Sequence, residues 1–187
     1  MLRNLNFEGL TFLIADGADN FRRIATGILR DFGAATILES KDGDNVLERL
    51  GRSQVDMLLC DSSLPGINGF SLIKKIRADE NPHRYIPIVL LTSHTQQDNV
   101  ERARDCGANM VVAKPISPRS LYSRLLWAAE NERAFIESKD YCGPDRRFKI
   151  EGFPTGVGRR AEDEIDETVG NADGPDMSQD EIDAMFK

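Results

Sequence analysis

The sequence predicts an α/β fold: a doubly wound five-stranded parallel sheet, followed by a largely disordered C-terminal tail. Two observations support this prediction. Through the first 137 residues, short apolar segments alternate with segments whose apolar residues recur at helical spacing. Nearly continuous apolar segments are typical of parallel strands buried on both faces. A chain of 187 residues has room for one domain of ordinary size plus an appendage, and too little for two large domains.

The first strand and helix show the pattern most clearly. Residues 10–15 form an apolar run that stops at Asp16. Asp19 or Asn20 is expected to cap the helix that follows, whose apolar residues recur every three or four positions up to Phe32. Further strands are expected at residues 35–39, 55–60, 86–91 and 110–113, and further helices at 42–50, 70–78, 96–106 and 118–133. This alternation implies right-handed crossovers and helices on both faces of the sheet.

Four polar residues stand where strands of this sheet are expected to end: Asp16, Asp61, Thr92 and Lys114. Ligands of doubly wound sheets bind outside the carboxyl ends of the strands, so the four side chains are expected to share one cleft. Two carboxylates suit Mg²⁺, which prefers oxygen ligands. A carboxylate beside Mg²⁺ can accept a phosphoryl group while a lysine and a hydroxyl stabilise its oxygens. An ordinary loop role would explain any one of these residues, but not the ordered set.

This pattern resembles the receiver domain of two-component response regulators, especially the chemotaxis type, over residues 9–133. The resemblance rests on Phe-Leu-Ile-Ala-Asp at 12–16, on Cys60-Asp61 with Leu-Pro-Gly-Ile-Asn-Gly at 64–69, on Leu-Thr-Ser at 91–93, and on Gly-Ala at 107–108 leading into Ala-Lys-Pro at 113–115. It implies a flavodoxin-like fold and a phosphorylatable, stand-alone response regulator of a phosphorelay. Such a protein is a phosphoacceptor that signals through protein contacts, in chemotaxis or motility, and is not an enzyme beyond self-dephosphorylation.

The resemblance also implies a role for each site residue. Asp61 would accept phosphate from a histidine kinase or phosphotransfer protein, Thr92 would be the switch hydroxyl, and Lys114 would pair with the phosphate. Asp16 and Asp61 would bind Mg²⁺ through their carboxylates, and Ser63 through its backbone carbonyl.

Two positions depart from the family pattern. Gly17 stands where many receivers carry a second acidic residue that touches the metal, so weaker Mg²⁺ binding is expected. Val111 stands where many receivers have a rotating aromatic residue, so switching through an aromatic side chain is excluded there. Gly17 favours a second interpretation, a pseudo-receiver scaffold or adaptor whose C-terminal peptide tethers another receiver. Intact Asp61, Thr92 and Lys114 argue against it.

Charge divides the rest of the chain. Residues 1–137 carry a net charge of −1, residues 138–160 of +3 and residues 161–187 of −9. We therefore expect residues 138–176 to be a linker, basic and then acidic, without stable structure. Two interpretations of its arginine pairs, at 146–147 and 159–160, are open. The pairs are part of a solvated linker, or they bind a phosphate-rich ligand such as a cyclic dinucleotide. The nearly neutral receiver argues against duplex DNA as a partner.

The last eleven residues, 177–187, recover a helical pattern. Ser178 and Glu181 have the spacing of a capping box, and Ile182, Met185 and Phe186 fall on one helical face. Residues 178–186 resemble the N-terminal peptide of the flagellar motor switch protein, which binds the phosphorylated chemotaxis regulator. We therefore expect a short docking helix for a receiver surface, either this chain's own or that of another receiver. A frayed acidic tail is the alternative.

The cysteines and the hydropathy pattern indicate where in the cell the protein is expected. The three cysteines are odd in number and have no zinc-site spacing, which is typical of a reduced compartment. No apolar run approaches the roughly 20 residues of a membrane helix, and no secretory signal is recognisable at the start. A cytoplasmic location without membrane contact is expected.

Overall fold

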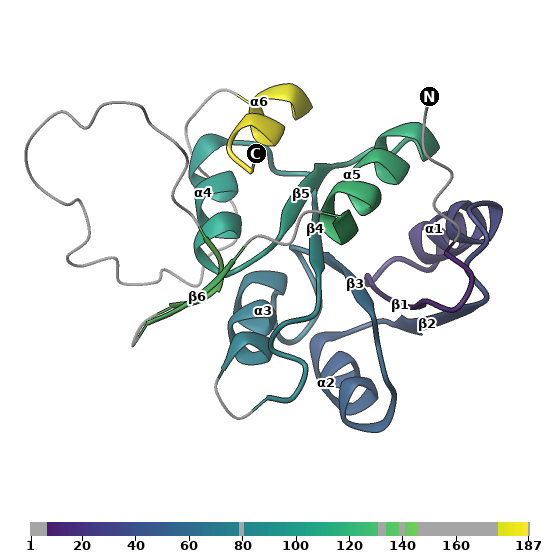
Figure 1. Ribbon diagram of the computed structural model, residues 1–187. Coiled ribbons are helices and arrows are strands. Elements are labelled where there is room, and N and C mark those ends of the chain that lie inside the picture. Colours follow the sequence, from purple (N-terminus) through teal and green to yellow (C-terminus); the bar gives the residue numbers. More distant parts are fainter. Residues whose placement is uncertain (1–6, 79–80, 131–133, 139–140, 146–175, 187) are drawn as a thin grey trace, which may run out of the picture.

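The computed structural model describes residues 7–78, 81–130, 134–138, 141–145 and 176–186. Five strands form one sheet in the order β2-β1-β3-β4-β5 (Figure 1). They are β1 (Thr11–Ala15), β2 (Thr36–Ser40), β3 (Met57–Asp61), β4 (Ile88–Thr92) and β5 (Met110–Ala113). Every neighbouring pair in this sheet is parallel, so the predicted doubly wound sheet is confirmed.

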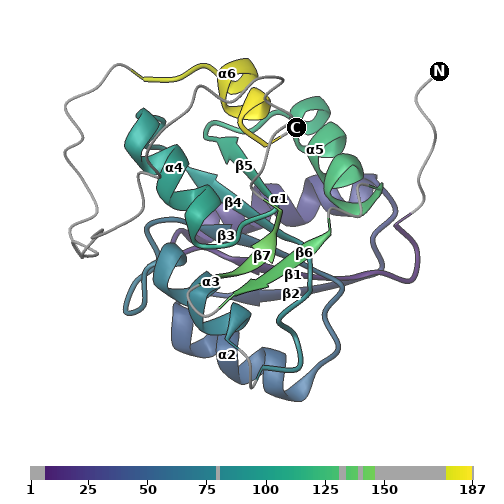
Figure 2. The same cartoon turned by 60° about the vertical axis from the view of Figure 1, so that its left-hand side comes forward.

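Helices cover both faces of the sheet. They are α1 (Asp19–Asp31), α2 (Gly43–Arg52), α3 (Gly69–Arg77), α4 (Gln97–Asp105) and α5 (Pro118–Glu130). In Figure 2, α1 and α5 lie above the sheet while α2 and α3 lie below it. The central strands β3 and β4 are therefore buried at every residue, which explains their continuous apolar sequence. No helix among the described residues is long and apolar enough to cross a membrane.

The start of α1 differs from the expectation. Neither Asp19 nor Asn20 caps this helix; its N-cap is Ala18, without a side-chain cap. Instead, the Ala18 N–H donates to Asp16 Oδ1 at 2.7 Å. The Asp19 side chain is 83% exposed and pairs with Arg22 within the helix. The carboxylate at the end of β1 thus bonds the backbone of the N-cap residue, which holds the carboxylate in place without capping the helix.

The core begins two residues before the expected domain start at residue 9. Phe7 is buried, and its ring lies 5.4 Å from that of Phe12 and 5.9 Å from that of Tyr122, both edge-on. The ring of Phe32 at the end of α1 lies 5.0 Å from Tyr122. Such edge-to-face pairs add about 0.5–1.5 kcal/mol each beyond area burial. This aromatic cluster anchors the start of the chain between α1 and α5.

A short antiparallel hairpin follows α5, formed by β6 (Phe135–Ser138) and β7 (Tyr141–Pro144). The prediction of an unstructured linker over 138–176 is wrong for β7. Residues 146–175, which include both arginine pairs, lie outside the described residues. The hairpin packs against the turn before β5, where Gly107 has a φ of +96° and a Cβ would lie 2.8 Å from the carbonyl oxygen of Cys142. Only glycine permits this approach.

The last described element is α6 (Gln179–Ala184), which lies beside α4 and α5 (Figure 1). The predicted capping box is present, with Ser178 and Glu181 bonded to each other's backbone. The Ser178 hydroxyl and the Ser178 N–H each donate to the Glu181 carboxylate at 2.7 Å, and these two bonds lower the pKa of the Glu181 carboxyl. The stability that these carboxylate bonds contribute is therefore fully present above the ordinary pKa of a glutamate and is lost as the pH falls through the lowered pKa. The bond from the Glu181 N–H to the Ser178 hydroxyl does not depend on this protonation.

Candidate functional site

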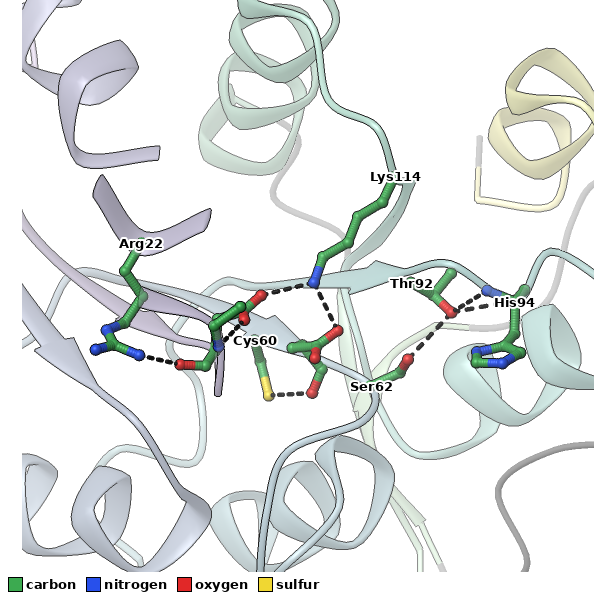
Figure 3. Close-up of polar contacts among 9 residues, drawn as sticks. Arg22, Cys60, Ser62, Thr92, His94 and Lys114 are labelled. Atoms are coloured by element: carbon green, nitrogen blue, oxygen red, sulfur yellow. Dashed lines mark hydrogen bonds and ion pairs between the residues drawn. The ribbon is translucent and has the colours of Figure 1, made fainter. Parts of the chain in front are cut away.

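The carboxyl ends of the strands meet at one edge of the sheet. The register pairs Asp61 with Leu91 and Thr92 with Ala113, so β3, β4 and β5 end at one level. The residues predicted to share a cleft follow these ends: Asp16 after β1, Asp61 and Thr92 as the last residues of β3 and β4, and Lys114 after β5. Figure 3 shows the polar contacts at this edge.

Lys114 joins the two carboxylates. Its Nζ lies 2.6 Å from Asp16 Oδ2 and 2.9 Å from Asp61 Oδ1 (Figure 3). Asp16 is 1% exposed and Asp61 is 9% exposed, so the charges interact with little screening by water. The Phe21 ring centroid lies 4.2 Å from Nζ and adds a cation–π contact. The structure thus gathers two anionic groups around one fixed positive charge.

Arg22 supports this cluster from α1, although the sequence did not single it out. Its Nη1 donates to the backbone oxygen of Asp16 at 2.6 Å, and its Nε lies 3.3 Å from Glu39 Oε2. Together with the Ala18 N–H, these bonds fix both the main chain and the side chain of Asp16. The only signal for Arg22 was its position one turn into the helix that follows the strand.

The Thr92 hydroxyl is engaged by its own loop. It donates to the carbonyl oxygen of His94 at 3.1 Å and accepts from the His94 N–H at 3.0 Å. It also accepts from the Ser62 hydroxyl at 3.1 Å. Ser62 was not among the predicted site residues; its place directly after Asp61 was the available signal. The backbone of His94, rather than its imidazole, contacts the threonine (Figure 3).

The loop after β3 returns closely over Asp61. The Gly69 N–H donates to the backbone oxygen of Ser62 at 3.0 Å, and the Asn68 side chain caps α3. A Cβ on Gly69 would lie 2.3 Å from the backbone oxygen of Asp61, so no larger residue fits. Ser63 lies exposed at the start of this loop. This tight return fixes the backbone around Asp61.

Cys60 lies directly before Asp61 and is fully buried. Burial, and next the nearby Asp61 carboxylate, raise the pKa of its thiol well above the usual value. The thiol therefore stays protonated at neutral pH and packs as a small apolar side chain. This agrees with its interpretation as a core residue.

The residues present fit a Mg²⁺ ion with few protein ligands. Among the described residues, no group of three or more His, Cys, Asp or Glu side chains converges on one point. Asp16 and Asp61 nevertheless place carboxylate oxygens within reach of the same Lys114 nitrogen. Oxygen donors of this kind suit Mg²⁺, which retains several water ligands. Asp19 adds no third carboxylate, because its side chain is exposed and paired with Arg22.

Restoring a second acid should strengthen metal binding. In Gly17→Asp we expect Mg²⁺ affinity to rise roughly tenfold, because another carboxylate adds a negative charge next to a hard cation. A Cβ at position 17 would lie 3.1 Å from the Pro65 ring, which must yield by a few tenths of an ångström. Affinity is measured by Mg²⁺ titration of backbone amide shifts. Gly17→Asn meets the same ring without the charge and should not bind more tightly; equal affinities of Gly17→Asp and wild type would contradict the prediction.

Comparison with known proteins agrees with this geometry. The family of the response regulator receiver domain matches residues 12–126. This chain belongs to that family. Receiver domains are generally signalling domains rather than enzymes, bind Mg²⁺ at the phosphorylation site, and interact with histidine kinases or phosphotransfer proteins. The match covers the sheet apart from Thr11, the four strand-end residues and most of α5, and stops before the hairpin and α6.

Individual relatives of this receiver are chemotaxis proteins. It is 30% identical to chemotaxis protein CheY-3 of Vibrio cholerae, over 63% of this chain and 90% of the relative. It is 31% identical to chemotaxis protein CheY of Pseudomonas aeruginosa, over 62% and 93% respectively. A solved structure of a putative response regulator from Chloroflexus aurantiacus has a TM-score of 0.60 at 29% identity, covering 65% of this chain and 98% of that one. Chemotaxis protein CheY4 of Vibrio cholerae, at 24% identity, shares the fold with a TM-score of 0.59, covering 64% and 98%.

Proposed function

We propose that this receiver accepts a phosphoryl group on Asp61 from a histidine kinase or phosphotransfer protein, and signals through protein contacts in chemotaxis or motility. The observation that supports this most is the Lys114 ammonium, held between the carboxylates of Asp16 and Asp61 at 2.6 and 2.9 Å. The chemotaxis proteins among the relatives support the kind of pathway.

The reaction needs little beyond positioning and charge. A carboxylate oxygen of Asp61 forms the new P–O bond as the P–N bond of a donor phosphohistidine breaks. The electron pair of the P–N bond stays on the imidazole nitrogen. Lys114 Nζ lies next to Asp61 Oδ1, so its charge offsets that of the incoming group. The Thr92 hydroxyl, at the end of the neighbouring strand, donates to a phosphoryl oxygen.

The proposed Mg²⁺ site uses the carboxylates of Asp16 and Asp61 and the backbone carbonyl of Ser63. When bound, the ion supplies positive charge against the phosphoryl oxygens. Three hydrogen bonds fix the position of Asp16. Lys114 and the Ala18 N–H donate to its carboxylate, and Arg22 donates to its backbone oxygen.

Phosphorylation of the purified protein tests the proposal. Incubation with acetyl phosphate and Mg²⁺ is expected to add one phosphoryl mass to the wild type and none to Asp61→Asn, because the amide is not a nucleophile. Intact-mass spectrometry gives the result. Asp31→Asn, at the exposed end of α1, is the matched control and should be labelled like the wild type. Labelling of Asp61→Asn would contradict the assignment.

A second candidate is a pseudo-receiver scaffold that no longer cycles phosphate. Gly17 is the observation that favours it, because it removes a potential metal ligand. This function predicts that the wild type gains no phosphoryl mass from either acetyl phosphate or a phosphorylated histidine donor. The two candidates therefore differ in one measurement.

We also propose that residues 177–187 bind a receiver surface through Ile182, Met185 and Phe186. Ile182 and Phe186 are fully buried and Met185 is half-buried. Burial of large apolar side chains on a short terminal helix supports a docking role over a frayed tail.

A further inference from the structure

The C-terminal segment, residues 176–186, lies across the outer edge of β5. Figures 1 and 2 both place α6 beside α4 and α5, and α6 contacts β5. An isolated helix of this length is marginal in water. Its two apolar anchors, Ile182 and Phe186, are both 0% exposed, so packing against the receiver must supply its stability.

Gln179 bonds the edge of β5 as a neighbouring strand would. Its Oε1 accepts from the Ala113 N–H at 2.7 Å, and its Nε2 donates to the Val111 carbonyl at 3.0 Å. β5 is the last strand in the sheet order, so its outer backbone groups otherwise lack a ladder partner. One amide side chain satisfies both groups, and no particular side chain of β5 is needed for this recognition.

An ion pair fixes the helix against α5. Asp183 Oδ2 lies 2.6 Å from Arg124 Nη2, and the two side chains are 10% and 12% exposed. Asp183 Oδ1 also accepts from Gln179 Nε2 at 2.8 Å. The three side chains form one network at the centre of the contact. Because it is largely shielded from water, this ion pair also selects the docked position.

The C-terminal segment also forms hydrogen bonds with the loop that follows β4. The Met177 N–H donates to the Thr95 carbonyl at 2.8 Å. Asp176 Oδ1 accepts from Gln96 Nε2 at 2.8 Å and from the Thr95 hydroxyl at 3.2 Å. Asp176 and Gln96 also form a β-bridge. These bonds hold residues 95–96 in one arrangement.

Residues 95–96 belong to the same loop as His94, whose backbone bonds the Thr92 hydroxyl. The Thr92 hydroxyl has a single proton, which it donates to the His94 carbonyl. To donate to a phosphoryl oxygen on Asp61, it must give up that bond. The docked segment therefore binds a loop arrangement in which Thr92 is occupied, and on its other side it bonds Ala113, the neighbour of Lys114.

We propose that the surface formed by loop 95–96, the outer edge of β5 and Arg124 is a docking site for the chain's own residues 176–186, and that phosphorylation of Asp61 releases them. This preference is opposite to that of the flagellar peptide that residues 178–186 resemble, because the docked segment binds a loop that occupies the Thr92 hydroxyl. The release rests on the phosphoacceptor role proposed above; the docking does not. Only thirty residues separate Asp145 from Asp176, so this tether raises the local concentration of the segment to about the millimolar range. Release would expose both the receiver surface and the acidic helix to a partner.

The coupling is reciprocal. If phosphorylation of Asp61 weakens docking about tenfold, removal of the segment shifts the equilibrium of phosphoryl transfer from the donor toward phosphorylated Asp61 by up to the same factor. The segment thus acts as an intramolecular antagonist of the phosphorylated state. Hydrogen exchange of the Ala113 amide reports docking directly, because that N–H bonds to Gln179 alone among the described contacts.

The test uses the full chain and pulsed hydrogen exchange at Ala113. In unphosphorylated protein we expect exchange at least about tenfold slower in the wild type than in Gln179→Ala or in Ile182→Ala plus Phe186→Ala. Gln97→Ala removes an exposed glutamine side chain of α4, which bonds Glu101 on the same helix. This variant is the matched control and should keep the protection. After acetyl phosphate and Mg²⁺, exchange in the wild type should approach that of the tail variants.

Each other outcome overturns a named part of the proposal. Equal exchange in wild type and Gln179→Ala contradicts docking. Protection that fades on dilution of the protein places the segment on a second copy and contradicts docking in cis. Protection that survives phosphorylation, with phosphoryl mass present in the same sample, contradicts release. Absence of that mass contradicts the proposed function and with it the release, while the comparison of variants still decides the docking.

Discussion

Gly69→Ala is expected to destabilise the receiver by about 3 kcal/mol or more, because the added methyl collides with backbone rather than with a movable side chain. Its Cβ would lie 2.3 Å from the backbone oxygen of Asp61 and 2.9 Å from Cα of Ser62. Relief of this clash must displace the loop over Asp61. We therefore also expect phosphorylation by acetyl phosphate to slow in the folded fraction. Urea denaturation measures the first effect, and intact-mass time courses measure the second.

Gly27→Ala is the matched control. Gly27 is exposed in the middle of α1, and a Cβ there meets nothing within 4 Å. Alanine should stabilise the helix by about 0.5–1 kcal/mol and leave phosphorylation unchanged. The two substitutions add the same methyl and should move the urea midpoint in opposite directions. An unchanged or raised urea midpoint in Gly69→Ala would show that the loop does not approach Asp61 as closely as described.

Replacing Arg77 by leucine should be the most damaging change remote from the site. Arg77 is 2% exposed, and its guanidinium donates to three backbone carbonyls and to the side chain of Asn109: Gly107 at 3.0 Å, Arg84 at 2.5 Å, Ile86 at 2.8 Å and Asn109 at 2.9 Å. It also lies over the Phe135 ring at 5.0 Å. Burial lowers the pKa of Arg77 to about 10, so it remains charged at neutral pH.

Leucine leaves these buried acceptors unpaired, and we expect a loss of about 4 kcal/mol. For a chain of this size, that lowers the Tm by about 10 °C. Differential scanning calorimetry gives the Tm. Arg77→Lys keeps the positive charge but lacks the several N–H donors of the guanidinium group, so its Tm should lie between those of the wild type and Arg77→Leu. The Arg52 side chain is 76% exposed, so Arg52→Leu should change the Tm little. A similar fall in Tm in both leucine variants would contradict the stabilising role of the buried Arg77 hydrogen bonds.

The sheet could be predicted from the sequence because its signal is local. Each buried strand is a short apolar run, and each run ends at a polar residue. Since parallel strands end at one edge, the order of Asp16, Asp61, Thr92 and Lys114 in the chain already implied their proximity. The structure places Lys114 on both carboxylates. The chemical roles assigned to these residues stay predictions.

What the sequence missed depends on contacts between distant segments. The hairpin β6–β7 has no alternating pattern, and it is held by Arg77 and by the close approach to Gly107. The cap of α1 was misassigned because the helix already begins at Asp19, so that Ala18 is the N-cap and Asp19 lies inside the helix, where it pairs with Arg22. In the tail, the apolar face was visible from helical spacing. The polar residues Gln179 and Asp183 were not singled out, because their partners on the receiver lie 66 and 59 positions away in the sequence.

Chemical mapping of the phosphorylated residue tests the phosphoacceptor assignment most directly. Borohydride reduces an aspartyl phosphate to homoserine, which tandem mass spectrometry locates in the chain. After acetyl phosphate and Mg²⁺, homoserine is expected at position 61 and at no other aspartate. Among the aspartates that the structure describes, Asp61 alone combines the strand end, the Lys114 contact at 2.9 Å and the loop that returns over it. Homoserine at position 16 or elsewhere, or a phosphoryl group on a hydroxyl or imidazole that borohydride leaves unchanged, would contradict the assignment.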